Sequence, residues 1–130
     1  MFNNPMTSHL YPNAFMLHNG IHLVERGQDY AVTELEITEN SYNPYGIVHG
    51  GAYYTMADCA AGHAARSDGR RYVTQGSNLH FLRSADSGTL RATARVYHRG
   101  RKTCLLKLEI RDETDELLVT GDFTFFCLDN

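Results

Sequence analysis

No run of apolar residues in this 130-residue sequence is long enough to cross a lipid bilayer. The first fifteen residues, MFNNPMTSHLYPNAF, also lack the charged start and the apolar segment of a signal peptide. We therefore expect a soluble, cytoplasmic protein with no membrane partner. Because a chain of this length can bury a core without disulfides or metals, we expect one domain over residues 1–130.

Cysteine is scarce, and several motifs of known chemistry are missing. The three cysteines, Cys59, Cys104 and Cys127, form no C-x-x-C pair, which argues against a disulfide framework or a thiolate zinc site. We expect them to be buried thiols. The sequence also has no H-E-x-x-H zinc motif, G-x-S-x-G elbow, G-x-G-x-x-G loop or Walker loop. We therefore expect no metal site, no nucleotide-dependent redox chemistry and no phosphoryl transfer.

The net charge of -3 argues against a general nucleic-acid binder, so we expect no nucleic-acid partner. The basic residues are nevertheless unevenly placed. Eleven of the twelve Lys and Arg lie between Arg66 and Arg111, together with only three of the fifteen acids. Ten of the twelve are Arg, whose planar guanidinium suits phosphate and carboxylate oxygens. They could form a solvated sheet face paired with Glu34, Glu36 and Glu39, and a few could form a phosphate site.

Hydrophobic periodicity predicts two strands, one long helix and then four strands. The first strand pair is expected at 21–25 and 30–37, and the helix, which lacks internal proline, at about 50–66. Alternation with period two predicts the other strands at 72–83, 89–98, 103–112 and 117–127. A short helix within residues 9–19 is expected in an N-terminal extension over residues 1–20. This order indicates an α+β domain, with one helix covering a mostly antiparallel sheet.

The stretch NPYGIVHGGAYYTMAD, residues 43–58, joins a turn to the predicted long helix. The first backbone N–H groups of a helix have no partner within the helix, and they attract negative charge. Because Gly50 has no Cβ, its N–H is open to an oxygen that gains charge, as in an oxyanion hole. A sharp turn into the helix would explain the two glycines equally well, and both interpretations stay open.

Asp58 lies among small apolar residues in the middle of the same helix, where aspartate is unfavourable. A buried carboxylate needs a hydrogen-bonding partner or a function, although an aspartate on the solvent side of the helix needs neither. Gly50 and Asp58 are eight positions apart, about 12 Å along a helix axis, and cannot both reach one carbonyl carbon. If both act on one substrate, Asp58 must face the Gly50 of a second chain. The spacing thus predicts a homodimer with two composite sites.

The pattern N-P-Y-G-I-V-H-G-G-x6-D, followed by FLRSA and HRGRKT, closely resembles the hot-dog-fold acyl-CoA thioesterases of the phenylacetate-degradation type. These belong to the 4-hydroxybenzoyl-CoA thioesterase-like superfamily, and the likeness covers about residues 20–127. The resemblance implies a hot-dog fold, in which an antiparallel sheet of about six strands wraps around one long central helix. It also implies an acyl-CoA substrate, no cofactor other than the CoA of that substrate, and homodimers that pair into a homotetramer.

The same resemblance implies roles for particular residues. The Gly50 N–H would bind the thioester carbonyl, and Asp58 of the partner subunit would be the nucleophile or the general base. Asn43 and His49 would line the site, and Thr74 would help to place the water. The CoA phosphates would meet four basic residues, Arg83, Arg99, Arg101 and Lys102. The sequence departs from the family pattern in FLRSA, where Ser84 replaces a proline that commonly follows the arginine.

The residues leave the acyl group and the function class partly open. Tyr53, Tyr54 and Met56 could line a pocket for an aryl or medium acyl group, or could belong to the core or the dimer interface. We expect a thioesterase acting on short, medium or aryl acyl-CoA. A non-catalytic acyl-CoA binding or sensing domain of the same fold would not need Asp58. A hydratase or dehydratase usually pairs an acid with a catalytic histidine at a different spacing, whereas His49 adjoins the glycines.

Overall fold

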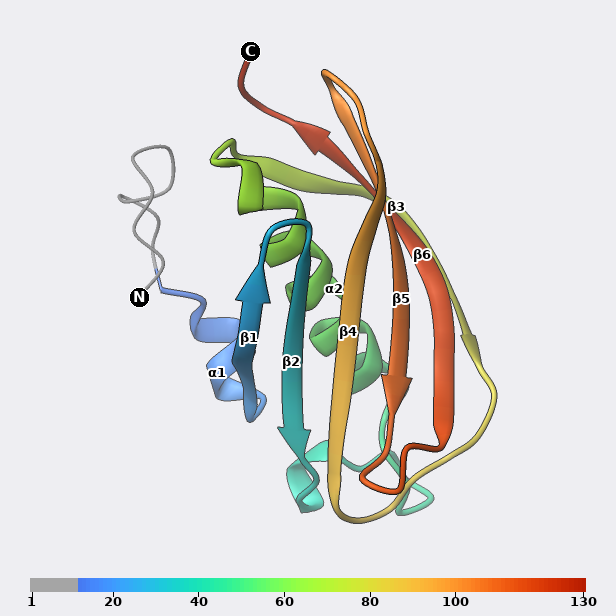
Figure 1. The fold of residues 1–130 in the computed structure, drawn as a ribbon. Coiled ribbons are helices and arrows are strands. Elements are labelled where there is room, and N and C mark those ends of the chain that lie inside the picture. Colours follow the sequence, from blue (N-terminus) through green and yellow to red (C-terminus); the bar gives the residue numbers. More distant parts are fainter. Residues whose placement is uncertain (1–11) are drawn as a thin grey trace.

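The computed structural model describes residues 12–130 and shows the predicted order of two strands, one long helix and four strands. The strands are β1 (Ile21–Gly27), β2 (Tyr30–Glu36), β3 (Tyr72–Phe81), β4 (Thr89–Arg99), β5 (Thr103–Arg111) and β6 (Leu117–Cys127). The helices are α1 (Ala14–His18) and α2 (Gly50–Ala65), with short 3-10 turns at Glu39–Ser41 and Arg66–Asp68. All neighbouring strands are antiparallel in the order β1-β2-β4-β5-β6-β3, so β1 and β3 are the edges (Figure 1).

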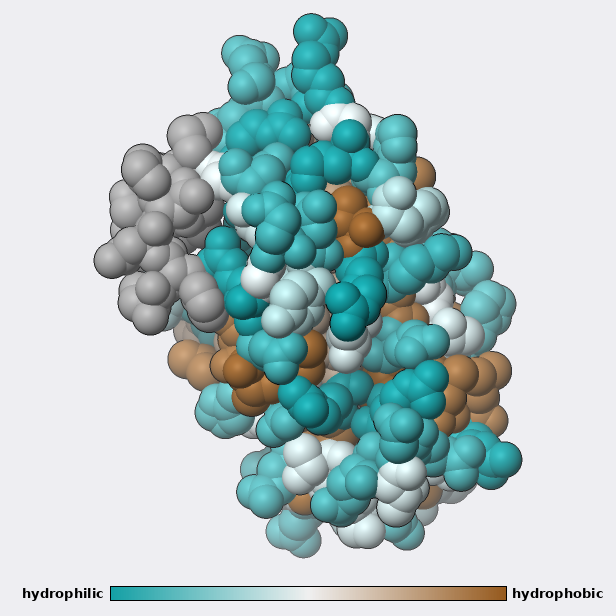
Figure 2. All heavy atoms as spheres, viewed as in Figure 1, coloured by the Kyte–Doolittle hydropathy of each residue, from teal (hydrophilic) through white to brown (hydrophobic). Residues whose placement is uncertain are grey.

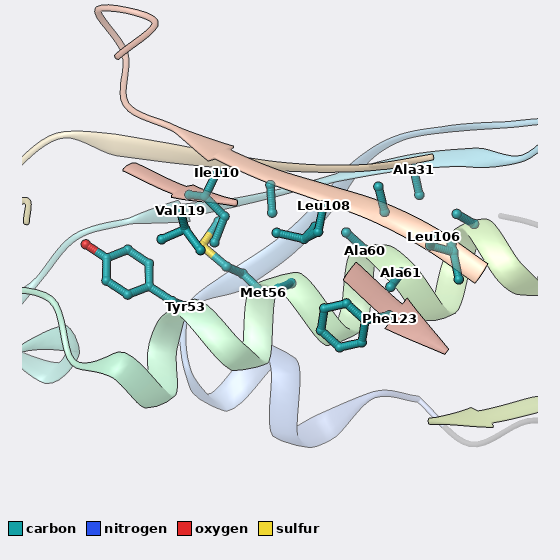
Figure 3. Packing of buried hydrophobic residues seen from close by; sticks show 14 of the residues in the cluster. Ala31, Tyr53, Met56, Ala60, Ala61, Leu106, Leu108, Ile110, Val119 and Phe123 are labelled. Atoms are coloured by element: carbon teal, nitrogen blue, oxygen red, sulfur yellow. The ribbon is translucent and has the colours of Figure 1, made fainter. Parts of the chain in front are cut away.

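Helix α2 lies across one face of the sheet, and the core fills the space between them (Figure 1). The side of α2 that faces the sheet carries mostly alanines, which allow a close approach. Figure 3 shows Ala60 and Ala61 of α2 near Leu106 and Leu108 of β5. These side chains are fully or almost fully buried, and each buried leucine contributes about 1.5–3 kcal/mol relative to an exposed one. The period-two alternation therefore identified the core face of β5 correctly.

Strand β3 differs from the other strands because most of its side chains are exposed along its whole length. It pairs with β6 on one side only, which leaves the backbone groups of its other edge without a strand partner in residues 12–130. A β-bulge at Gln75, between Thr74 and Gly76, shifts its register against β6. An exposed edge strand of this length is a ready surface for pairing with another strand.

Helix α1 confirms the short helix expected within residues 9–19, although residues 9–11 lie outside the described residues. Residues 1–11 of the predicted N-terminal extension also lie outside them. The Asn13 side chain caps α1 by accepting a hydrogen bond from the Met16 N–H at 3.1 Å, and Met16 is buried in the core. Within residues 12–130, no helix has the length and apolar character needed to cross a membrane.

Candidate active site

The N-terminus of α2 leaves one backbone N–H group unused. His49 is the N-cap residue, and its Nδ1 accepts a hydrogen bond from the Gly51 N–H at 2.8 Å. The Nδ1 atom is therefore unprotonated, and the neutral ring carries its proton on Nε2. The Gly50 N–H has no acceptor among the described residues. His49 thus satisfies one donor of the helix terminus and leaves the adjacent one available to a ligand.

Asn43 shapes the loop that leads into this helix terminus. Its Oδ1 accepts hydrogen bonds from the Tyr45 N–H at 2.8 Å and the Ile47 N–H at 3.3 Å. These two bonds fix the orientation of the side-chain amide, so that its Nδ2 is a donor without a partner in the described chain. Asn43 therefore both folds the loop and offers a second N–H group near Gly50.

A cavity of about 310 Å³ lies at this end of α2. We call it the Gly50 pocket. Phe81, at the end of β3, packs so close that a Cβ on Gly50 would lie 3.2 Å from its ring. A Cβ at this position would therefore require the Phe81 ring to shift by a few tenths of an ångström. The pocket walls include Asn43, Gly50, Tyr53, Phe81, Arg83 and Ser84.

Asp58 lies two turns along α2 and is paired with Thr74. The Thr74 hydroxyl donates a hydrogen bond to Asp58 Oδ1 at 2.5 Å, a short distance typical of a bond to a carboxylate. Thr74 immediately precedes the bulge in β3, and bulges often re-aim side chains next to active sites. Asp58 is only partly buried, so its other oxygen can meet water or a substrate.

A second cavity, also of about 310 Å³, opens beside Asp58. We call it the Asp58 pocket. Its walls include Asn13, Phe15, Tyr54, Asp58, Cys59 and Ser77. Cys59 is therefore only half-buried, which corrects the prediction of three buried thiols, whereas Cys104 and Cys127 are buried. Burial, together with the neighbouring charge of Asp58, raises the pKa of Cys59 to about 11, so this thiol is protonated at neutral pH.

Gly50 and Asp58 line different cavities within one chain. This arrangement is what their eight-residue spacing on one helix predicts, since the two groups are about 12 Å apart along the axis. The structure thus brings Gly50 together with Asn43 at one end of the molecule, and Asp58 together with Thr74 nearer the other end. His49 lies beside the first group as the helix cap.

The predicted CoA-phosphate residues separate into two groups. Arg83 lines the Gly50 pocket, where it also pairs with Glu116 at 3.3 Å. Arg101 and Lys102 lie in the turn between β4 and β5, beside the start of β3. About nine residues of extended strand separate the two groups within one chain, or roughly 30 Å.

The predicted role of Arg99 in binding the CoA phosphates is wrong, because its guanidinium group is fully hydrogen-bonded within the protein. All five of its N–H donors have partners, namely Asp29, the Ala64 and Ala65 carbonyls and the Tyr72 hydroxyl. It also forms an ion pair with Asp68 at 2.9 Å, and its side chain is only 19 % exposed. Arg99 therefore caps the C-terminal end of α2 and has no donor left for a phosphate.

The three residues proposed for the acyl pocket, Tyr53, Tyr54 and Met56, differ in burial and in the cavity that they line. Met56 is fully buried between α2 and the sheet, so its assignment to a pocket is wrong (Figure 3). Helix α2 is apolar on most of its surface, and the sequence therefore did not reveal which side faces the sheet. Tyr53 is also buried, but it borders the Gly50 pocket and packs 5.3 Å from the Phe81 ring. Tyr54 is exposed and lines the Asp58 pocket.

Sequence reasoning missed most of the walls of the Asp58 pocket, and among the missed residues are Asn13 and Phe15. Both come from α1, far from the HGG motif in the sequence. No local pattern marks them, because α1 is a single short helix with one buried residue, Met16. The only indication in the sequence is Phe15 itself, a large apolar residue that is not part of the buried core.

The six-stranded antiparallel sheet around one long helix, with an HGG helix terminus, defines a hot-dog-fold protein. Residues 45–119 match the family model described as "Thioesterase superfamily". This chain belongs to the thioesterase superfamily and is a thioester hydrolase of the hot-dog fold.

Individual relatives agree with this assignment. The 1,4-dihydroxy-2-naphthoyl-CoA hydrolase of Listeria monocytogenes is 36 % identical over 102 residues, which cover 76 % of this chain and 83 % of that protein. The acyl-coenzyme A thioesterase PaaI of Escherichia coli is 34 % identical over 92 residues, or 70 % of this chain and 66 % of PaaI. The solved PaaI structure has a TM-score of 0.87 at 27 % identity and covers 91 % of this chain and 86 % of that chain. The solved structure of conserved protein PA5202 of Pseudomonas aeruginosa has a TM-score of 0.87 at 31 % identity. The match covers 90 % of this chain and 95 % of that chain.

Proposed function

We propose that this protein hydrolyses acyl-CoA thioesters to a free acid and CoA in two composite sites of a homodimer. Each site would combine the Gly50 pocket of one chain with the Asp58 pocket of its partner. The observation that carries the proposal is that the Gly50 N–H, without an acceptor among the described residues, and the partly exposed Asp58 carboxylate lie in different cavities of one chain. The relatives named as acyl-CoA thioesterase and CoA hydrolase support the substrate class.

The geometry of β3 supports such a dimer. Thr74, which binds Asp58, is near the start of β3, and Phe81, which packs on Gly50, is its last residue. If two β3 strands pair antiparallel across a two-fold axis, the start of one strand lies opposite the end of the other. This pairing would use the open edge of β3 and would place Asp58 near the Gly50 of the partner subunit.

The same pairing would join the two groups of basic residues. Arg83 follows the end of β3, whereas Arg101 and Lys102 lie beside its start. In an antiparallel pair, Arg83 of one chain would approach the turn that carries Arg101 in the other. We assign Arg83, Arg101 and Lys102, without Arg99, to the CoA phosphates. The pairing of such dimers into a homotetramer stays a prediction.

In the proposed mechanism, the thioester carbonyl oxygen accepts a hydrogen bond from the Gly50 N–H, with the Asn43 amide as a second donor. The helix terminus stabilises the negative charge that develops on this oxygen when the carbonyl carbon is attacked. The partner subunit's Asp58 either removes a proton from the attacking water or attacks the carbon itself. Thr74, hydrogen-bonded to that carboxylate, holds it in place. The C–S bond then breaks and CoA leaves as a thiolate. If Asp58 acts as the base, the proton that it has taken passes to the CoA sulfur and the free acid forms directly. If Asp58 attacks the carbon, the acyl group is left on its carboxylate as an anhydride, and water then hydrolyses this anhydride to the free acid and restores Asp58, while the CoA thiolate takes up a proton from water.

Asp58→Asn tests the proposal, because asparagine keeps the shape of the side chain but removes its negative charge. We expect wild type to release free thiol from acyl-CoAs and Asp58→Asn to lose at least about a hundredfold in kcat, with CoA binding retained. Asp122→Asn, at an exposed position on β6, is the matched control and should keep wild-type activity. Hydrolysis by Asp58→Asn at the wild-type rate would overturn the mechanism.

The absence of thiol release from any acyl-CoA by wild type, with retained acyl-CoA binding, would instead favour the alternative of a non-catalytic acyl-CoA binding domain. A folded protein that consumes enoyl-CoA without releasing thiol would favour a hydratase. Measuring thiol release and enoyl-CoA consumption on the same sample therefore distinguishes a thioesterase, a binding domain and a hydratase.

A further inference from the structure

Two aromatic side chains beside Asp58 are exposed although they are large and apolar. Phe15 is 68 % exposed and Tyr54 is 41 % exposed, and both line the Asp58 pocket. Figure 2 shows apolar surface gathered over α1 and β1. Neither ring belongs to the buried cluster that forms the core. Exposed aromatic rings around a cavity are typical of a binding site for an apolar group.

Helix α1 is held firmly against this cavity. Its N-cap residue Asn13 accepts a hydrogen bond from the Met16 N–H at 3.1 Å and donates one to Cys59 Sγ at 3.5 Å. At the other end, the Asn19 side chain donates to the Phe15 carbonyl at 2.8 Å. The buried Met16 side chain anchors the helix to the core. Phe15 is adjacent to the buried Met16, so its position is fixed by the packing of α1. This wall of the Asp58 pocket is therefore largely pre-formed.

The two cavities differ in charge. The Gly50 pocket includes Arg83, which suits the CoA end of the substrate. None of the described residues that line the Asp58 pocket is Lys or Arg, and its one charged group is the carboxylate. Both cavities have a volume of about 310 Å³, so it is the difference in charge, and not in size, that favours the Asp58 pocket for an uncharged acyl group.

Helix α1 lies outside the part of the chain that matches the family model. The match covers residues 45–119, which include Gly50, Asp58 and Thr74 but neither Asn13 nor Phe15. The catalytic framework thus belongs to the matched region, whereas one wall of the Asp58 pocket does not.

We infer that the Asp58 pocket is the acyl-group subsite and that Phe15 is a specificity-determining residue, which favours apolar acyl groups long enough to reach its ring. This inference rests on the proposed function. The acyl carbon chain or aryl ring would leave the carbonyl carbon beside Asp58 and pack against Phe15 and Tyr54. Acetyl-CoA, whose acyl group is too short for this contact, would not depend on Phe15.

A series of acyl-CoAs tests the inference on the full-length protein, with acetyl-, butyryl-, hexanoyl-, octanoyl- and phenylacetyl-CoA as substrates. In Phe15→Ala, we expect KM for octanoyl- and phenylacetyl-CoA to rise about tenfold, the fold-change for losing about one aromatic or aliphatic contact. We expect kcat to stay within about twofold, and acetyl-CoA kinetics to remain unchanged. Phe15→Leu should restore most of the loss for octanoyl-CoA.

Leu17→Ala is the matched control, because Leu17 is another exposed apolar residue of α1, at 50 %, that does not line the pocket. If Leu17→Ala gives the same change as Phe15→Ala, the effect comes from the stability of α1, and the inference fails. An equal rise of KM for acetyl-CoA and all longer substrates would mean that the pocket holds the pantetheine arm, which also overturns it. If wild type hydrolyses none of the substrates, the proposed function has failed rather than the assignment of Phe15.

Discussion

The two ends of helix α2 contrast in how their backbone groups are satisfied. At the C-terminal end, Arg99 binds the Ala64 and Ala65 carbonyls, and Asp68 joins Arg99 to Arg70. At the N-terminal end, His49 binds one N–H group and leaves Gly50 without an acceptor in the described chain. One end is closed by a dense network of charged and polar side chains, and the other faces an open cavity.

The closed end of α2 has a structural role. Asp68 accepts hydrogen bonds from the Tyr72 hydroxyl at 2.6 Å and from Arg70 Nε at 2.9 Å, and its side chain is 15 % exposed. Such a network fixes the end of α2 against the start of β3. Gly50, at the opposite end, is half-buried and its N–H lies at a cavity, and the proposed function assigns this donor to the substrate.

The largest effect is expected from removing the Gly50 N–H without disturbing the helix. Gly50 is the first residue of α2, where proline is well tolerated, and His49 before it has the extended conformation that a following proline requires (φ -66°, ψ 139°). Gly50→Pro should lower kcat by about 10²–10³-fold relative to Gly50→Ala, which adds a Cβ near Phe81 but keeps the N–H.

Because kcat of Gly50→Pro is compared with kcat of Gly50→Ala, the effect of crowding against Phe81, which both variants share, largely cancels. Circular dichroism should show the same helix content for both. If Gly50→Pro and Gly50→Ala hydrolyse acyl-CoA at equal rates, the N–H group does not stabilise the reaction, and the open end of α2 has no catalytic role.

A smaller effect, on stability rather than on turnover, is expected at the closed end. Burial alone would raise the pKa of Asp68, but hydrogen bonds from Tyr72 and Arg70 and the charge of Arg99 outweigh it and lower the pKa below its ordinary value of 3.8. The stabilisation is therefore complete above about pH 4 and is lost as the pH falls through the lower folded pKa. Asp68→Asn should lower the free energy of unfolding at pH 7 by about 2 kcal/mol.

Urea unfolding at pH 7 and at about pH 2 measures this difference. The difference between wild type and Asp68→Asn should be smaller at the lower pH, because the unfolded carboxyl group is protonated below its ordinary pKa of 3.8 and the stabilisation by the charge is lost as the pH falls toward the lower folded pKa. Glu109→Gln, which breaks an exposed pair with Arg111, is the matched control and should change stability by less than about 1 kcal/mol. A constant difference between wild type and Asp68→Asn at both pH values would show that the charge of Asp68 does not stabilise the fold.

Much of the fold was predictable, because the sheet buries one face in strict alternation. Leu106, Leu108 and Ile110 occupy every second position of β5 and are all buried. The long helix was predictable from its small residues and its lack of proline. Its buried side was harder to predict, because only Thr55, Asp58 and His63 mark its polar side and apolar residues lie all around it, and Met56 was therefore assigned to a pocket although it is buried in the core.

The candidate site was predictable where its parts lie in one segment and not where they meet only in space. The eight-residue interval between Gly50 and Asp58 predicted that the two groups cannot reach one carbonyl carbon within a single chain, because helix geometry alone sets that distance, and the two residues do line different cavities. The interior network of Arg99 and the wall supplied by Phe15 depend on contacts between distant segments. Nothing in the local sequence distinguishes an arginine that binds a helix terminus from one that binds a phosphate.

The central claim, that each site takes Gly50 from one chain and Asp58 from its partner, is tested most directly by mixing two inactive variants. Asp58→Asn and Gly50→Pro chains would be unfolded, combined in equal amounts and refolded together. Random pairing makes half of the dimers mixed, and each mixed dimer has one complete site, so about a quarter of wild-type activity should return. If activity stays at the level of the separate variants although mixed dimers form, each site lies within one chain and the account is contradicted.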